Sequence, residues 1–134
     1  MIAVSRVQVD GFQQLYLFKS EVTRVYDGDT ITVVMDLSFK ISMEASIRIS
    51  GIDTPELRGS PPEEKRLARI ARDRMKELCG KQVWVESMNG GKKDKYGRVL
   101  GRVYTMDGED IADIMIKEGH AIEYGGKKKT HVWA

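Results

Sequence analysis

The sequence predicts a mainly β fold in which five strands close into a small barrel and a helix separates the third strand from the fourth. The order of the patterns indicates this fold: three strand-like segments come first, then one long helical pattern, then two more strands and a short helix. This is the element order of a five-stranded OB-fold barrel. From the pattern alone, a small α+β domain with a sheet packed on a helix remains the alternative.

Three strands are predicted before the long helix. The first covers residues 15–26 and ends at the turn signal Asp27-Gly28-Asp29, and the second covers the β-branched residues 30–36. Residues 40–50 alternate between apolar and polar, which predicts a third strand, and the short connections predict an antiparallel meander. The apolar face of the third strand, which we expect to point into the core, comprises Ile41, Met43, Ala45, Ile47 and Ile49.

The long helix is predicted over residues 60–79. Ser60 is a suitable N-cap, Pro61 suits the first helical position, and Gly80 suits the position just after the helix. The remaining elements follow in a simple order, with strands over residues 82–86 and 99–105 and a short helix over residues 111–118.

The composition describes one folded domain. The chain has 134 residues, the length of a single domain, and 41% apolar with 31% charged residues is an ordinary globular balance. Cys79 is the single cysteine, which excludes an intramolecular disulfide, and two distant histidines argue against a zinc site. We therefore expect one domain over residues 1–134, and a monomer.

From the sequence we expect no membrane span and no signal peptide. Its longest apolar stretches are too short to span a bilayer, and residues 1–20 lack a basic region followed by an apolar one. We therefore expect a cytoplasmic protein without a membrane partner. If a leader peptide had been removed from this chain, the protein would instead be secreted.

Positive charge is concentrated in two places. The net charge is only +2, but lysines and arginines gather at residues 92–98 and again at Lys127–Lys129. A local basic patch attracts phosphate groups even at a modest net charge. A lysine run is also a common solvated surface, so charge alone does not identify a nucleic-acid partner.

Acidic residues stand at the ends of two predicted strands. Asp27 and Asp29 flank Gly28 after the first strand, and Asp53 follows the third strand. If both strand ends lie at one rim of the barrel, Asp29 and Asp53 can converge on one cation, and a substrate phosphate can complete this oxygen-only site. The residues alone do not choose between Ca²⁺ and Mg²⁺, and Asp-Gly-Asp is also an ordinary hairpin turn.

Other residues suit phosphate chemistry. The guanidinium of Arg48 or Arg98 can grip two phosphate oxygens, and Tyr96 offers a ring on which a base can stack. Glu56 follows Thr54-Pro55, and a carboxylate near a metal and a phosphate can accept a proton from water. Each of these residues taken alone also has a structural explanation, as a salt-bridged strand residue, a turn anchor or a helix-flanking acid.

Taken together, three segments resemble the staphylococcal (thermonuclease-like) nuclease family. They are Asp27-Gly-Asp-Thr30, then Arg48 five residues before Asp53-Thr-Pro-Glu56, then Asp94-Lys-Tyr-Gly-Arg98. The resemblance covers about residues 20–124. It implies an OB-fold barrel and Ca²⁺-dependent hydrolysis of phosphodiester bonds in DNA and RNA, with cleavage of the P–O5′ bond. Single-stranded substrates are expected to be favoured, because a shallow barrel groove reads exposed bases and backbone.

The resemblance also implies roles for single residues. Asp29, Asp53 and the backbone carbonyl of Thr54 correspond to calcium ligands, with Asp27 as a nearby assisting acid. Arg48 and Arg98 correspond to the catalytic arginines, and Glu56 to the glutamate assigned as general base. Residues expected beside the nucleotide are Lys95, Tyr96 and, more weakly, Tyr124.

Two departures and two rival functions accompany the resemblance. The loop between Glu56 and the helix is short, and residues 1–14, which have no counterpart, are predicted to add a strand.

The chief rival function is that of an OB-fold module that binds single strands without cleaving them. A small structural or interaction domain is the other, although the basic residues around the site count against it.

Overall fold

Five strands close into a barrel, as predicted, in a computed structural model that describes residues 16–125 and residue 133. The predicted additional strand in residues 1–14 and the basic cluster Lys127–Lys129 lie outside the described residues. Around the barrel the strand order is β1-β2-β3-β6-β5. The barrel strands are β1 (Leu17–Asp27), β2 (Thr30–Asp36), β3 (Ser42–Ile49), β5 (Gln82–Ser87) and β6 (Arg98–Tyr104).

Strand pairing confirms the predicted meander and closes the barrel. β1 with β2 and β2 with β3 pair antiparallel, while β3 pairs parallel with β6 over Ser46–Ile49. Alternate side chains fill the interior, so that Ile31, Ile47 and Val85 are fully buried. The interior is therefore a packed core, and any site must lie on the rim or the outer surface.

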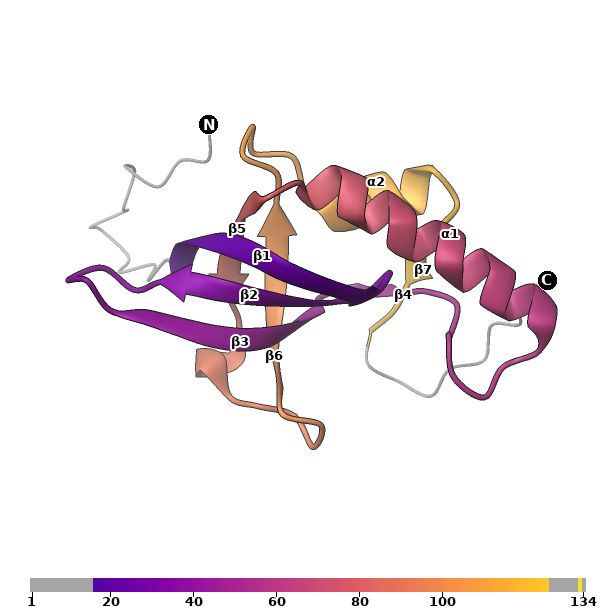
Figure 1. Ribbon diagram of the computed structural model, residues 1–134, viewed down its shortest axis with the longest axis horizontal. Coiled ribbons are helices and arrows are strands. Elements are labelled where there is room, and N and C mark those ends of the chain that lie inside the picture. The colour runs from indigo at the N-terminus through magenta and orange to yellow at the C-terminus, as the bar shows by residue number, and fades with distance from the viewer. Residues whose placement is uncertain (1–15, 126–132, 134) are drawn as a thin grey trace.

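The prediction that Ile41 and Met43 point into the core is wrong. Ile41 is 56% exposed and Met43 is 42% exposed, whereas Ala45, Ile47 and Ile49 of the same strand are buried as predicted. The reason is the length of the β3–β6 pairing, which begins only at Ser46. The first half of β3 pairs with β2 alone and extends beyond the barrel as a two-stranded arm (Figure 1).

Helix α1 (Pro62–Cys79) separates the third and fourth barrel strands, as predicted. Ser60 is not its N-cap and Pro61 is not its first residue: Pro61 is the N-cap, and no side chain caps the helix. A residue before proline is disfavoured in the α region, and Pro61 is accordingly extended, with ψ of 155°. Gly80 ends the helix as expected, with φ of 58°.

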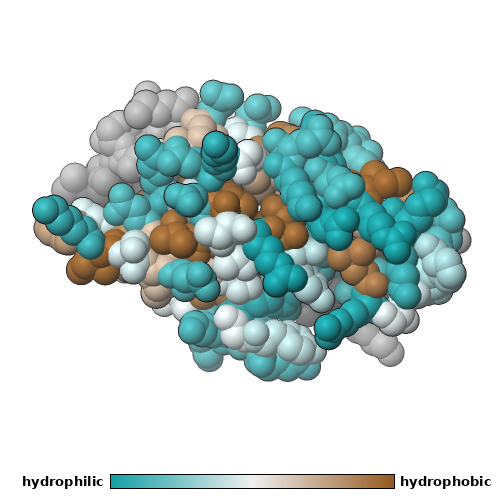
Figure 2. Space-filling view, viewed as in Figure 1, coloured by the Kyte–Doolittle hydropathy of each residue, from teal (hydrophilic) through white to brown (hydrophobic). Residues whose placement is uncertain are grey.

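The inner face of α1 packs onto the end of the barrel. Its buried residues include Ala71 and Met75, while Figure 2 shows hydrophilic side chains over its outer surface. A Cβ atom on Gly28 would lie 3.0 Å from Ala71 Cβ and 2.9 Å from Thr54 Cγ2. Only glycine therefore lets the β1–β2 turn pack this closely between α1 and the segment that follows β3.

A second, two-stranded sheet was not predicted. β4 (Ile52–Asp53) pairs antiparallel with β7 (Ile122–Glu123), and Tyr124 N–H donates to Gly51 O at 2.9 Å. The two remaining short helices are η1 (Asn89–Gly91) and α2 (Ile111–Lys117). The β4–β7 pair brings Tyr124 beside the end of β3. Neither helix α1 nor α2 is long and apolar enough to cross a membrane.

Candidate active site

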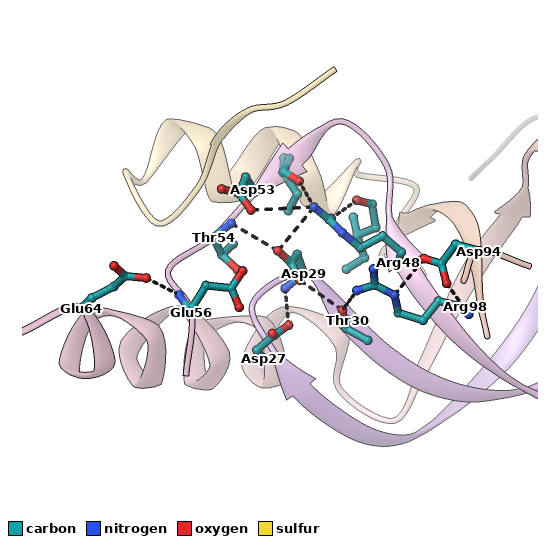
Figure 3. Close-up of polar contacts among 12 residues, drawn as sticks. Asp27, Asp29, Thr30, Arg48, Asp53, Thr54, Glu56, Glu64, Asp94 and Arg98 are labelled. Carbon is teal, nitrogen blue, oxygen red and sulfur yellow. Dashed lines mark hydrogen bonds and ion pairs between the residues drawn. The ribbon is translucent and has the colours of Figure 1, made fainter. Parts of the chain in front are cut away.

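Three carboxyl groups meet at the barrel rim where β1, β2 and β4 approach one another (Figure 3). Asp27 ends β1, Asp29 lies in the β1–β2 turn, and Asp53 lies in β4. All three are buried, with exposures of 7%, 4% and 3% respectively. Ile49 N–H donates to the Asp29 carbonyl at 2.8 Å, which ties the end of β3 to this turn.

Arg48 holds Asp29 and Asp53 together. Its Nη2 atom lies 3.6 Å from Asp29 Oδ2 and 3.9 Å from Asp53 Oδ1. The same guanidinium donates to the carbonyls of Ile49 and Ile52, at 2.7 Å and 2.8 Å. The predicted convergence of Asp29 and Asp53 is therefore present, with the guanidinium of Arg48 between them and the backbone.

The rim formed by Asp27, Asp29 and Asp53 carries three carboxyl groups close together. Asp29 N–H donates to Asp27 Oδ1 at 3.1 Å, so the two side chains are neighbours. Burial raises the pKa of Asp27 to about 7, and the charge of Asp29 adds to the rise. Arg48 contacts both Asp29 and Asp53. Because three carboxyl groups lie close together here, they would also stabilise a bound metal cation.

A hard cation fits the donor atoms of this rim. Asp29 Oδ2 accepts from Thr54 N–H at 3.3 Å, so Thr54 lies directly against the carboxylate. Thr54 Oγ1 is buried and has no hydrogen-bond partner among the described residues. No group of three or more His, Cys, Asp or Glu side chains in the described part of the chain is arranged to hold a metal. Two carboxylates would therefore need backbone, water or phosphate oxygens to complete the site.

Asp94 and Arg98 form the opposite side of the site. Asp94 Oδ1 accepts from the N–H groups of Tyr96 and Arg98, both at 2.9 Å, and Asp94 Oδ2 accepts from Arg98 Nε at 3.0 Å. Desolvation raises the pKa of Asp94, but these hydrogen bonds and the Arg98 charge outweigh it and hold the pKa below its usual value. The turn therefore orients the guanidinium of Arg98 before any ligand binds.

Arg98 also contacts the acidic rim through Thr30. Arg98 Nη1 donates to Thr30 Oγ1 at 3.3 Å, and Thr30 Oγ1 donates to Asp29 Oδ1 at 3.1 Å. The arginines thus reach Asp29 from two sides, Arg48 directly and Arg98 through one hydroxyl (Figure 3).

Two tyrosines flank the arginines. The Tyr96 ring is 70% exposed, and its centroid lies 5.2 Å from both Arg98 Cζ and Lys95 Nζ. The Tyr124 ring lies 5.8 Å from Arg48 Cζ. All three residues expected beside a nucleotide therefore lie at this site, and the exposed face of Tyr96 suits base stacking.

Glu56 lies on the short loop between β4 and α1. Its N–H donates to Glu64 Oε2 at 2.9 Å, and its carbonyl accepts from Ser60 Oγ. These contacts brace the loop from within the chain. In Figure 3 the Glu56 side chain lies on the Asp27 and Asp29 side of its backbone, with Glu64 on the other side.

Asp27, Asp29, Glu56, the two arginines and the two tyrosines line one cleft of about 720 Å³, whereas Asp53, Thr54 and Asp94 lie behind its lining. A larger open groove, of about 960 Å³, lies at the far end of α1, but none of the arginines or acids described above lines it. Sequence reasoning missed several lining residues, because ordinary strand residues carry no motif. They are Arg24, Tyr26, Thr32 and Ser46. Only the folded barrel brings these residues of β1, β2 and β3 to the cleft.

Comparison with known proteins agrees with this geometry. The family described as "Staphylococcal nuclease homologue" matches residues 46–132. A protein of Escherichia coli named as an uncharacterized endonuclease is 38% identical over 104 residues, covering 77% of this chain and 59% of that protein. Endonuclease YncB of Bacillus subtilis is 32% identical over 109 residues, covering 81% of this chain and 49% of that protein.

A third relative extends the comparison to a protein named for its activity. Micrococcal nuclease of Shigella flexneri is 31% identical over 115 residues, covering 80% of this chain and 59% of that protein. The chain spans between 49% and 59% of the length of these three relatives. The family match over residues 46–132 and these relatives together show that the chain belongs to the staphylococcal nuclease homologue family.

Proposed function

We propose that this chain is a calcium-dependent nuclease that hydrolyses phosphodiester bonds of DNA and RNA, with single strands favoured. The observation that carries the proposal is one cleft lined by Asp27, Asp29, Glu56 and two arginines, with Asp53 held against it by Arg48. The relatives named as endonucleases and as a nuclease support the reaction class.

The residues proposed to hold the calcium ion are Asp29, Asp53 and the backbone carbonyl of Thr54, with Asp27 assisting beside Asp29. Oxygen ligands of this kind suit Ca²⁺. A bound calcium ion supplies Lewis-acid stabilisation of a non-bridging phosphate oxygen. The buried excess of carboxyl groups at this rim supports a cation there.

Glu56 is proposed to orient or deprotonate the attacking water. Its exposed side chain lines the cleft, and the hydrogen bonds from Ser60 and to Glu64 hold its backbone in place. Attack of water on phosphorus breaks the P–O5′ bond and leaves a 3′-phosphate and a 5′-hydroxyl. A carboxylate held beside the acidic rim is suited to accept the proton of that water.

Arg48 and Arg98 are proposed to stabilise the charge that grows on the phosphoryl oxygens and the leaving oxygen. Both guanidinium groups are partly withdrawn from water, with side-chain exposures of 12% and 25%. A preorganised cation in such a place is worth more than one in bulk water. Removing either arginine is expected to raise the activation free energy of the chemical step by about 3–4 kcal/mol, which is the cost of losing one oxyanion donor.

Binding without cleavage is the second candidate, and one observation favours it. Arg48 already makes two hydrogen bonds to backbone carbonyls and two carboxylate contacts, which is the environment of a structural arginine. The exposed Tyr96 ring between two cations would bind a base in either case.

Cleavage of single-stranded DNA and RNA, measured with Ca²⁺ and with chelator, tests the proposal. The test variant is Glu56→Gln, and Glu44→Gln is the matched control, because Glu44 is an exposed acid on the β3 arm away from the cleft. We expect cleavage only with Ca²⁺, retained by the control and lost by the Glu56 variant. Binding of the strands without calcium-dependent cleavage would favour the second candidate.

A further inference from the structure

A second groove adjoins the candidate active site. It has a volume of about 480 Å³ and runs between β1 and α1. Arg24 and Tyr26 line both this groove and the cleft of the site, so the two hollows meet at these two side chains. A ligand that occupies the cleft can therefore extend past Tyr26 toward α1.

Irregular pairing of β1 presents these two residues at the junction. The β1–β2 register shifts between Val22 and Arg24 and again between Val25 and Asp27. Such bulges twist a strand and redirect its side chains, and they are common beside active sites. Arg24 and Tyr26 are exposed on either side of buried Val25, and Arg24 Cζ lies 5.4 Å from the centre of the Tyr26 ring.

The groove is positively charged. Helix α1 contributes Arg72 and Lys76, and β1 contributes Arg24. None of the described residues that line the groove is acidic. Arg72 Nε does lie 3.4 Å from Asp73 Oδ1, but Asp73 is 63% exposed and does not line the groove. An exposed ion pair of this kind is weak, so Arg72 remains able to contact a phosphate.

We propose that this groove binds one arm of a single-stranded polynucleotide whose cleaved phosphate lies in the candidate active site. Tyr26 stacks on a base at the junction, with Arg24 beside it, and Arg72 and Lys76 contact the phosphates beyond. The inference rests on the proposed function and adds a binding surface for nucleotides distant from the scissile bond. Tyr96 and Tyr26, at separate parts of the cleft, would then hold bases on the two sides of the reacting phosphate.

Strand length distinguishes this groove from the cleft. A short strand of three nucleotides fits within the cleft alone, whereas a strand of twelve nucleotides also reaches α1. The binding of fluorescein-labelled strands of both lengths is measured by anisotropy in chelator, with the Arg72→Ala/Lys76→Ala double variant. We expect this double variant to bind the 12-mer more weakly than the wild type does and to bind the 3-mer with unchanged affinity. The slope of log affinity against log salt falls by about 0.7 for each cation removed.

The matched control is Lys65→Ala/Arg69→Ala. Lys65 and Arg69 lie on the same helix, and neither lines the groove or the cleft. Their double substitution removes the same charge as the test variant. The control is expected to bind both strands as the wild type does. Equal losses for the two double variants, or equal losses for the two strand lengths, would overturn the proposal in favour of general attraction to charge.

Tyr26→Leu and Tyr26→Phe test the stacking contact. Base stacking predicts that the leucine variant binds the 12-mer about fivefold or more weakly, whereas the phenylalanine variant binds normally. Equal binding by both variants would contradict a stacking role. A poly-glutamate peptide that competes as well as the 12-mer would show a groove for any polyanion and overturn the assignment to polynucleotides.

The failure of this inference and of the proposed function can be told apart. If the wild type cleaves the 12-mer in a calcium-dependent way but the Arg72→Ala/Lys76→Ala variant binds it normally, the groove proposal alone is overturned. Length-dependent binding through Arg72 and Lys76 without any cleavage supports the groove and overturns the nuclease.

Discussion

Arg98 and Thr30 join the two sides of the candidate active site. Arg98 Nη1 donates to Thr30 Oγ1 at 3.3 Å, and the same hydroxyl donates to Asp29 Oδ1 at 3.1 Å. One threonine at the start of β2 therefore couples the position of an arginine on β6 to a carboxylate of the acidic rim.

Replacing Thr30 by valine removes this coupling while keeping a β-branched side chain in the strand. A hydrogen bond of this kind is worth about 1 kcal/mol, so we expect kcat for cleavage to fall about fivefold. Steady-state kinetics on a single-stranded oligonucleotide measures the change. Thr30→Ser keeps the hydroxyl and is expected to restore the rate; a serine variant as slow as the valine variant would show that packing, not the hydroxyl, matters.

The pH dependence of stability should reveal the carboxylate of Asp94. Its folded pKa is lowered, so the carboxylate stabilises the fold above the unfolded pKa, about 3.9, and that stability is lost as pH falls through the folded pKa. Asp94→Asn is therefore expected to be less stable than the wild type at pH 6, with the difference shrinking near pH 3. Urea unfolding at both pH values measures it, and a difference that grows on acidification would be contrary to this account.

Gly28 is predicted to be intolerant of any side chain. The Cβ atom of Gly28→Ala would lie 3.0 Å or less from Ala71 Cβ and Thr54 Cγ2. Such overpacking costs about 1–3 kcal/mol of unfolding free energy. Gly125→Ala is the control, because no atom of the described residues lies within 4 Å of the added atom there. Denaturant unfolding of both variants tests the contact, and equal stabilities would contradict it.

Calcium binding is expected to stabilise the folded protein independently of cleavage. A ligand at ten times its dissociation constant adds about 1.4 kcal/mol, which raises Tm by about 3–6 °C for a domain of this size. Asp29→Asn removes one proposed ligand and should abolish the rise. Thermal unfolding in calcium and in chelator measures it. If the wild type has the same Tm in calcium and in chelator, calcium does not bind at the rim.

The barrel and the rim were predictable because the information is local. Alternation in residues 40–50 correctly predicted that Ala45, Ile47 and Ile49 enter the core, and Asp29 and Asp53 each mark the end of a strand. The two strand ends lie at one rim, so that these two acids converge as expected, but their contact with Arg48 was not predicted.

The errors arise where distant pairing overrides the local pattern. Ile41 and Met43 continue the apolar alternation but lie beyond the part of β3 that pairs with β6. The β4–β7 pair joins segments of two residues each, too short for any periodicity. Arg24 and Tyr26 reach the cleft where β1 shifts its register against β2, and alternation does not predict a bulge.

Cleavage of a single-stranded DNA oligonucleotide by the wild type and by Asp53→Asn, in calcium and in chelator, tests the central claim most directly. Asp107→Asn serves as the control, since Asp107 lies in a turn away from the cleft. We predict calcium-dependent cleavage by the wild type and the control, and a rate at least about 100-fold lower for Asp53→Asn, as for loss of a preorganised charge-stabilising group. A wild-type rate in calcium no higher than in chelator would contradict the account.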